Sequence, residues 1–281
     1  SGLAADPDTG HVFVADGSSA RIDEFDSHGN FVKTWGWGVR DAASEPQICT
    51  TATTCREGLP GGGAGQLDLP LGIALDEEGN VWVVDALNHR IQKFSPDGDF
   101  LLMAGGEVNK SKVAEREAQE ANAEPITVTE AEENLCTGVS GDLCGSGTEG
   151  TGNGQFSVIG FNDAISVAPG GIVYVGDLNR VLKFDEEGAY VGAIPLAEGG
   201  QTLSLTVTPD NRLYVISGSV KEKVGGSGNF EINSTVVREI GPSGEELGRL
   251  VGEWEGRKTP KDPAEIASDS EGNVYVAARV V

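Results

Sequence analysis

The chain has 281 residues, 38% of them hydrophobic, which is enough for one large all-β domain or two ordinary domains. Its 44 acidic and 20 basic residues give a formal net charge of -24, so it would repel nucleic acid and anionic membrane surfaces, which are bound through clustered Lys and Arg. A count of 41 Gly and one Met argues against a helical protein, and no apolar stretch is long enough for a membrane-spanning helix.

Short apolar runs recur along the chain in repeating units. The first unit contains GLAAD, HVFVAD, RIDEF and FVKTWG, and the second contains GIALD, NVWVVD, RIQKF and FLLMAGG. The third contains AISVA, IVYVGD, RVLKF and AYVGAI. A weaker fourth unit contains LSLTV, RLYVIS, VVREI and LGRLVG, and a fifth begins with AEIASDSEGNVYVAA.

The runs alternate apolar and polar residues with period two and are bounded by Gly, Asp, Asn or Pro, which is the pattern of antiparallel strands. Each full unit therefore predicts a four-stranded meander, and such a sheet must stack on a neighbour to bury its faces. The sequence predicts an all-β protein, a β-propeller of four-stranded antiparallel blades. We expect residues 1–281 to form a single domain with about four and a half blades.

A recurring phrase marks the turn between the second and third strands of a unit. In the second unit it is VVDALNHRIQKF, with an aspartate, an asparagine and an arginine at fixed spacing. Because the phrase returns in successive units, we expect these residues to be architectural, with the aspartate accepting hydrogen bonds and the arginine pairing with a carboxylate or carbonyl. They are Asp16 and Arg21; Asp85, Asn88 and Arg90; and Asp177, Asn179 and Arg180.

The stretch GQLDLPLGIALDEEGNVWVVDALNHRIQKFSPDGDFLLMAG resembles the NHL repeat, whose D-x-x-N-x-R core is present in it. The resemblance implies a propeller that usually has six blades. We therefore expect the remaining blades to lie in a longer parent chain.

Three insertions interrupt the repeats, at about 37–64, 106–153 and 217–235. In a four-stranded meander these connections emerge on one side, so we expect the insertions to decorate one face of the propeller. Within the second, residues 110–124 predict a solvated helix or a partner-binding arm, capped by Ser111. The third occupies the turn between the second and third strands of the fourth unit, and its Gly and Ser residues predict a flexible loop.

The cysteines form two close pairs within the first two insertions, Cys49 with Cys55 and Cys136 with Cys144. Their x5 and x7 spacings are wider than those of usual zinc pairs and no His lies near them, which favours local disulfides over a split metal site. Disulfides predict an extracellular or cell-surface protein. The segment EVNKSK, the acidic stretch and the Cys-Thr-Gly loop of the second insertion resemble secreted bacterial NHL proteins of actinobacteria.

Polar residues replace apolar ones when the first strands of the units are aligned near the propeller axis. Asn162, Asp163, Ser204 and Glu265 are the candidate ligand-binding residues at this channel mouth. Three of them, Asn162, Asp163 and Glu265, have the oxygen ligands that Ca²⁺ prefers. Alternatively, they simply face a water-filled channel.

The three histidines fall in different turns, so the sequence predicts no His cluster or catalytic triad, and we lean against an enzyme. The favoured function is a non-catalytic secreted or cell-surface scaffold that presents loops to a protein or carbohydrate partner. The alternative is a divalent-cation-dependent propeller hydrolase or lactonase with its metal at the channel mouth.

Overall fold

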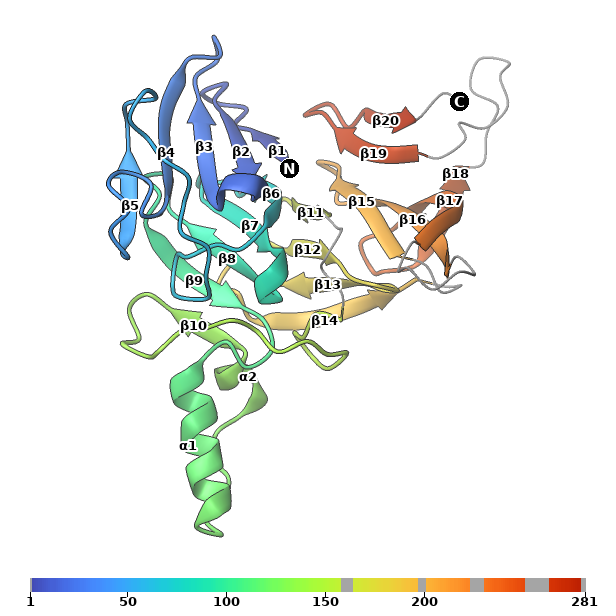
Figure 1. The fold of residues 1–281 in the computed structure, drawn as a ribbon. Helices are drawn as coiled ribbons and strands as arrows, with labels where there is room; N and C mark the ends of the chain where they lie inside the picture. Colours follow the sequence, from blue (N-terminus) through green and yellow to red (C-terminus); the bar gives the residue numbers. More distant parts are fainter. Residues whose placement is uncertain (1, 158–163, 197–200, 223–229, 251–262, 279–281) are drawn as a thin grey trace, which may run out of the picture. The chain divides into compact units, whose positions relative to one another are not determined.

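Antiparallel strands dominate the structure, a computed structural model that describes residues 2–157, 164–196, 201–222, 230–250 and 263–278 (Figure 1). The chain divides into two compact units, Ser1–Asp163 with Phe184–Gly192 as unit 1 and residues Ala164–Lys183 with Ala193–Val281 as unit 2. No helix in the described ranges is long and apolar enough to cross a membrane.

The first repeat forms a sheet with strand order β1-β2-β3-β4-β5. Four strands are the predicted meander, and the fifth comes from the first insertion. They are β1 (Leu3–Ala5), β2 (Val12–Asp16), β3 (Arg21–Phe25), β4 (Phe31–Trp37) and β5 (Pro46–Cys49).

The second repeat forms a sheet of the same design, with order β10-β9-β8-β7-β6. Its edge strand comes from the second insertion. The strands are β6 (Pro70–Leu75), β7 (Val81–Asp85), β8 (Arg90–Phe94), β9 (Phe100–Ala104) and β10 (Leu135–Thr137).

The two added edge strands place a cysteine at the same ladder position. Cys49 in β5 pairs with Thr34, which pairs with Asp23, two residues after Arg21. In the second sheet Cys136 pairs with Met103, which pairs with Gln92, two residues after Arg90. The first two insertions are therefore built alike, although their lengths differ.

The third and fourth repeats form four-stranded sheets in sequential order, and the described part of the fifth is a two-stranded sheet. The strands are β11 (Ile165–Val167), β12 (Val173–Gly176), β13 (Arg180–Phe184) and β14 (Tyr190–Pro195); β15 (Gln201–Val207), β16 (Leu213–Glu222), β17 (Phe230–Ile240) and β18 (Glu246–Leu250); and β19 (Pro263–Ser268) with β20 (Val274–Ala278).

The expectation of a flexible loop in the third insertion is wrong for much of its length. β16 and β17 stay paired from Ser217 opposite Val236 to Glu222 opposite Phe230, with one register shift. β16 and β17 pair with each other past the positions at which β15 and β18 are paired, so the hairpin extends beyond the four-stranded sheet. Residues 223–229 lie outside the described part of the chain.

The second insertion contains helix α1 (Lys110–Ala121) and the short helix α2 (Glu130–Glu133). The predicted helix is present, but its cap is Asn109, whose side chain accepts a hydrogen bond from the Lys112 amide at 3.1 Å. Ser111, the predicted cap, lies inside the helix, and its hydroxyl accepts from the Leu143 amide at 2.9 Å.

The two units have separate hydrophobic cores. In unit 1 the inward faces of the first two sheets bury large side chains, among them Phe13, Trp35, Val83 and Phe94. In unit 2 the core includes Val181, Leu205, Val215 and Ile240. Phe13 alternates with more exposed residues along β2, as the period-two pattern predicts, whereas every residue of β7 and β8 is buried.

Candidate functional site

The D-x-x-N-x-R turn of the second sheet, with Asp85, Asn88 and Arg90, anchors the end of the first insertion. Arg90 is fully buried, and its Nε donates to Asp85 Oδ2 at 2.8 Å. Its terminal nitrogens donate to the carbonyls of Gly62 at 2.6 Å, Gly63 at 3.0 Å and Gln66 at 2.7 Å. Burial raises the pKa of the Asp85 carboxyl, while the Arg90 charge opposes that shift.

Asn88 connects both insertions to the same turn. Its side-chain amide donates to the Gly61 carbonyl at 2.8 Å and to Asp85 Oδ2 at 2.9 Å. Its Oδ1 accepts from the Ser146 hydroxyl at 2.7 Å. The D-x-x-N-x-R residues thus satisfy buried polar groups of the loops around them, which is a structural role.

The other copies of the turn are looser or shorter. Arg21 Nε lies 3.6 Å from Asp16 Oδ2, and Arg21 also donates to the Arg56 carbonyl at 2.8 Å. In unit 2, Arg180 Nε donates to Asp177 Oδ2 at 2.8 Å. The Asn179 carbonyl there accepts from the Leu196 amide at 2.9 Å.

The predicted channel-mouth residues are only partly described. Asn162 and Asp163 lie outside the described residues. Ser204 is buried, and its hydroxyl accepts from the Ile266 amide at 3.3 Å, whereas Glu265 is exposed on β19. Across the described ranges no group of three or more His, Cys, Asp or Glu side chains is placed to hold a metal ion.

All four cysteines are paired, Cys49 with Cys55 and Cys136 with Cys144. Cys136 and Cys144 are buried in a small cluster with Met103 and Val108. The second disulfide therefore belongs to the core of its insertion.

A further repeat follows each disulfide, and our reading of the sequence missed it. CREGLPGGGAGQL and CGSGTEGTGNGQF share Cys, Gly and Gln at the same spacing. Gly58 and Gly147 donate to the carbonyls of Ser19 and Asn88 at 2.6 and 2.7 Å. A Cβ on either glycine would lie 2.3 Å from a backbone oxygen, so both positions require glycine. The shared spacing of Cys, Gly and Gln in the two segments was the feature of the sequence that could have identified this repeat.

The loop closed by the second disulfide exposes apolar side chains to solvent. Val139 is 95% exposed and Leu143 is 68% exposed. The loop backbone is nevertheless fixed, because the Gly138 amide donates to the Leu101 carbonyl and the Leu143 carbonyl accepts from the Lys110 amide, each at 2.8 Å.

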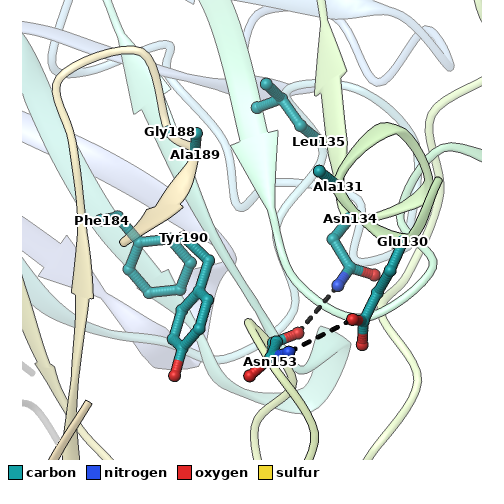
Figure 2. Close-up of a pocket in the computed structure, with 9 residues that line it drawn as sticks. All are labelled: Glu130, Ala131, Asn134, Leu135, Asn153, Phe184, Gly188, Ala189 and Tyr190. Atoms are coloured by element: carbon teal, nitrogen blue, oxygen red, sulfur yellow. Dashed lines mark hydrogen bonds between the residues drawn. The ribbon is translucent and has the colours of Figure 1, made fainter. Parts of the chain in front are cut away.

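A pocket of about 220 Å³ lies within unit 1, beside α2 (Figure 2). Phe184 and Tyr190 lie on one side, and Glu130 and Asn134 of the second insertion lie on the other. Asn153 at one end donates to Glu130 Oε2 at 3.3 Å, and its carbonyl accepts from Asn134 Nδ2 at 2.8 Å. The pocket therefore has an aromatic wall facing a polar wall.

The comparisons with known proteins agree with this architecture. The NHL repeat family model matches residues 67–94, and no curated protein matches the chain. Among solved structures, a chain of the nidogen/laminin complex is similar at 16% identity and a TM-score of 0.52, over 99% of this chain and 71% of that one.

Two further structures are similar at lower scores. Hydrazine synthase of Kuenenia stuttgartiensis has 12% identity and a TM-score of 0.48, over 95% of this chain. Virginiamycin B lyase from Staphylococcus aureus has 13% identity and a TM-score of 0.49, over 99% of this chain. The chain spans 51% of the length of the hydrazine synthase chain and 62% of the lyase chain. The four-stranded antiparallel sheets and the similarity to the nidogen/laminin chain show a β-propeller fold, and residues 67–94 match the NHL repeat.

Proposed function

We propose that this protein is a non-catalytic scaffold, secreted or held at the cell surface, that binds a protein partner through the disulfide loop 136–144. The observation that carries the proposal is the exposure of Val139 and Leu143 on a loop whose backbone is fixed. Isolated exposed apolar residues are ordinary, but here two of them occur on one covalently closed loop.

The loop is ordered before any partner arrives. Besides the disulfide, the Leu143 amide donates to the Ser111 hydroxyl at 2.9 Å, and Asn109 Nδ2 donates to Asp142 Oδ2 at 2.9 Å. Binding would therefore cost little conformational entropy, since the loop is already fixed in one shape. Such preorganisation favours a recognition loop over a flexible spacer.

The charge of the chain indicates the chemistry of the partner. The net charge is -24, and the acidic residue Asp142 lies within the loop. A partner with an apolar pocket for Val139 and Leu143, rimmed by Lys or Arg, would complement this surface. Charge attraction would also speed association at low ionic strength.

Two observations support the location and the class of function. The disulfides favour an oxidising compartment, because thiols are kept reduced in the cytosol. The propeller fold is shared with a chain of the nidogen/laminin complex, so the fold occurs in a protein assembly.

Site-specific photocrosslinking tests the proposal. A photoreactive amino acid at position 139 is compared with one at position 78, an exposed position in the turn between β6 and β7. Incubation with extracellular proteins of the producing cells should yield one dominant crosslinked protein from position 139, and the Leu143→Ser change should reduce its yield. The same products from both positions, or none from position 139, would contradict the proposal.

A further inference from the structure

The pocket beside α2 has a counterpart in the second sheet, beside Phe94 and Phe100. The pocket beside α2 carries polar groups that its counterpart lacks and that core packing does not require. Each of the first three sheets carries an edge-to-face aromatic pair at the turn between its third and fourth strands. The ring centroids are 6.0 Å apart for Phe25 and Phe31, 6.3 Å for Phe94 and Phe100, and 6.0 Å for Phe184 and Tyr190. Tyr190 thus brings a hydroxyl to a position that is Phe in the other two sheets.

The repeated segment after each disulfide shows a second difference at the same place. Gly65 packs against Phe100 in the second sheet, and its counterpart Gly154 lies beside Tyr190. The residue before the glycine is Ala64 in the first segment and Asn153 in the second. Both substitutions add a polar group to the same pocket, which lies where the repeats diverge.

The aromatic wall is held rigidly. Behind Tyr190 lies Phe184, which stacks on Phe156 with ring centroids 5.8 Å apart and an interplanar angle of 23°. The polar wall is held by the hydrogen bonds of Asn134 and Asn153, which leave the Glu130 carboxylate at the exposed margin. A rigid ring facing carboxylate and amide groups matches a ligand with one apolar face and several hydroxyls.

We propose that this pocket binds a single hexose residue of a neutral or amino sugar. The C–H face of the sugar ring would pack on Tyr190, and its hydroxyls would bond to Glu130, Asn153 and the Tyr190 hydroxyl. The proposal goes beyond the proposed function, because it assigns a second ligand to a pocket separate from the disulfide loop. The volume of about 220 Å³ is below the ~300–1,000 Å³ of sites for drug-sized ligands, so it suits one ring.

Charge selects among sugars. Glu130 lines the pocket, and the exposed residues Glu186 and Glu187 directly precede its lining residues Gly188 and Ala189. Uronic acids and sulfated sugars would be repelled by these carboxylates, whereas a glucosamine ammonium group would be attracted. An apolar peptide side chain would fit the aromatic wall but would form no hydrogen bonds with Glu130, Asn153 or the Tyr190 hydroxyl.

Saturation-transfer NMR on the intact, oxidised protein tests the proposal. The probes are methyl β-D-glucoside, methyl β-D-galactoside, methyl α-D-mannoside, N-acetylglucosamine, glucosamine and glucuronate, with N-acetylprolinamide as the peptide probe. At least one neutral or amino sugar should bind more tightly than glucuronate and N-acetylprolinamide.

The matched variants are Tyr190→Phe and Asn153→Ala, because the chain itself uses Phe100 and Ala64 at the equivalent positions. Each should weaken sugar binding about fivefold to tenfold through the loss of a hydrogen bond, without changing the melting temperature. Glu130→Gln should reduce the preference against glucuronate. Val139→Ser should leave sugar binding unchanged.

The proposal is overturned if none of the sugars shows saturation transfer at tens of millimolar, if both matched variants bind as the parent does, or if N-acetylprolinamide binds best. If no sugar binds but position 139 still gives its crosslink, only the proposed sugar site is refuted. If sugar binds but position 139 gives no crosslink, only the proposed protein partner is refuted.

Discussion

Arg90 Nε and Asp85 Oδ2 lie 2.8 Å apart, and both side chains are fully buried. Because the guanidinium also binds the carbonyls of Gly62, Gly63 and Gln66, at the end of the first insertion and just after it, the pair joins the second sheet to a loop that precedes it in the chain. The fixed fork of Arg suits this role, and a Lys ammonium would leave several of these carbonyls without donors.

Arg90→Ala should lower the free energy of unfolding by about 3–5 kcal/mol, the usual effect of breaking a buried ion pair from one side. The matched control is Arg21→Ala, at the same motif position in the first sheet. Arg21 is 21% exposed, lies 3.6 Å from Asp16 and 3.1 Å from Asp23, and donates to one loop carbonyl where Arg90 donates to three, so its loss should cost less, about 1–2 kcal/mol. Urea denaturation followed by circular dichroism measures both, and equal losses would refute the assignment of Arg90 as the stronger anchor.

The two disulfides should differ in their effect. Replacing either pair by Ser should cost about 2–3 kcal/mol from the freed loop. The Cys136→Ser, Cys144→Ser variant should lose more, because its hydroxyls would replace sulfurs packed against Met103 and Val108. It should also weaken the crosslink from position 139. Thermal melting of both double variants tests this ranking, and a larger loss from Cys49 and Cys55 would reverse it.

The capping box of α2 should control the polar wall of the pocket. Thr129 caps the helix and exchanges hydrogen bonds with Glu132, so Thr129→Ala should raise amide exchange in α2 about fivefold, the usual effect of removing an N-cap. Thr127→Ala is the control, since Thr127 bonds to Gln119 and caps no helix. Equal amide exchange in α2 for the two variants would show that the Thr129 cap does not stabilise this helix.

Acid should loosen the same helix. Hydrogen bonds from the Thr129 amide and hydroxyl lower the pKa of Glu132 below its ordinary 4.5. A lowered folded-state pKa gives a stabilising contribution that is complete above pH 4.5 and is lost as the pH falls through the lowered value. Amide exchange in α2, corrected for intrinsic rates, should therefore increase in that acidic range, and the Glu132→Gln variant should lose this dependence.

Calcium titration separates the scaffold from the hydrolase alternative. For a non-catalytic scaffold we expect calorimetry of chelator-treated protein to show no saturable one-site heat. A stoichiometric site that disappears in Asp163→Ala would instead place a cation with Asp163 and favour the hydrolase. Glu265→Ala would then show whether the second predicted carboxylate takes part.

Period-two alternation and the repetition of the units were sufficient to predict the main strands, although β7 and β8 are buried on both faces. The runs HVFVAD and RIQKF, for example, correspond to β2 and β8. β5 and β10 were not predicted, since PQIC and LCT are too short to show a period and form only by pairing with β4 and β9. The helix cap was misplaced because Asn109 and Ser111 are both good caps by residue type.

The pocket could not be predicted from local pattern. Glu130, Asn153 and Tyr190 meet through packing between an insertion and a distant strand, and no spacing in the sequence connects them. Aligning Phe31, Phe100 and Tyr190 would have identified the tyrosine as an exception. The polar side chains that face this tyrosine could be identified only from the structure.

The cysteines on β5 and β10 have a practical consequence for making the protein. Each one clamps the strand that covers the outer edge of a sheet, and an uncovered edge offers free amides and carbonyls to other chains. Production in a reducing cytoplasm would remove these covalent links, so opening of β5 or β10 would more often expose the edges of β4 and β9 and favour aggregation. Export to an oxidising compartment during expression is therefore the route to usable protein.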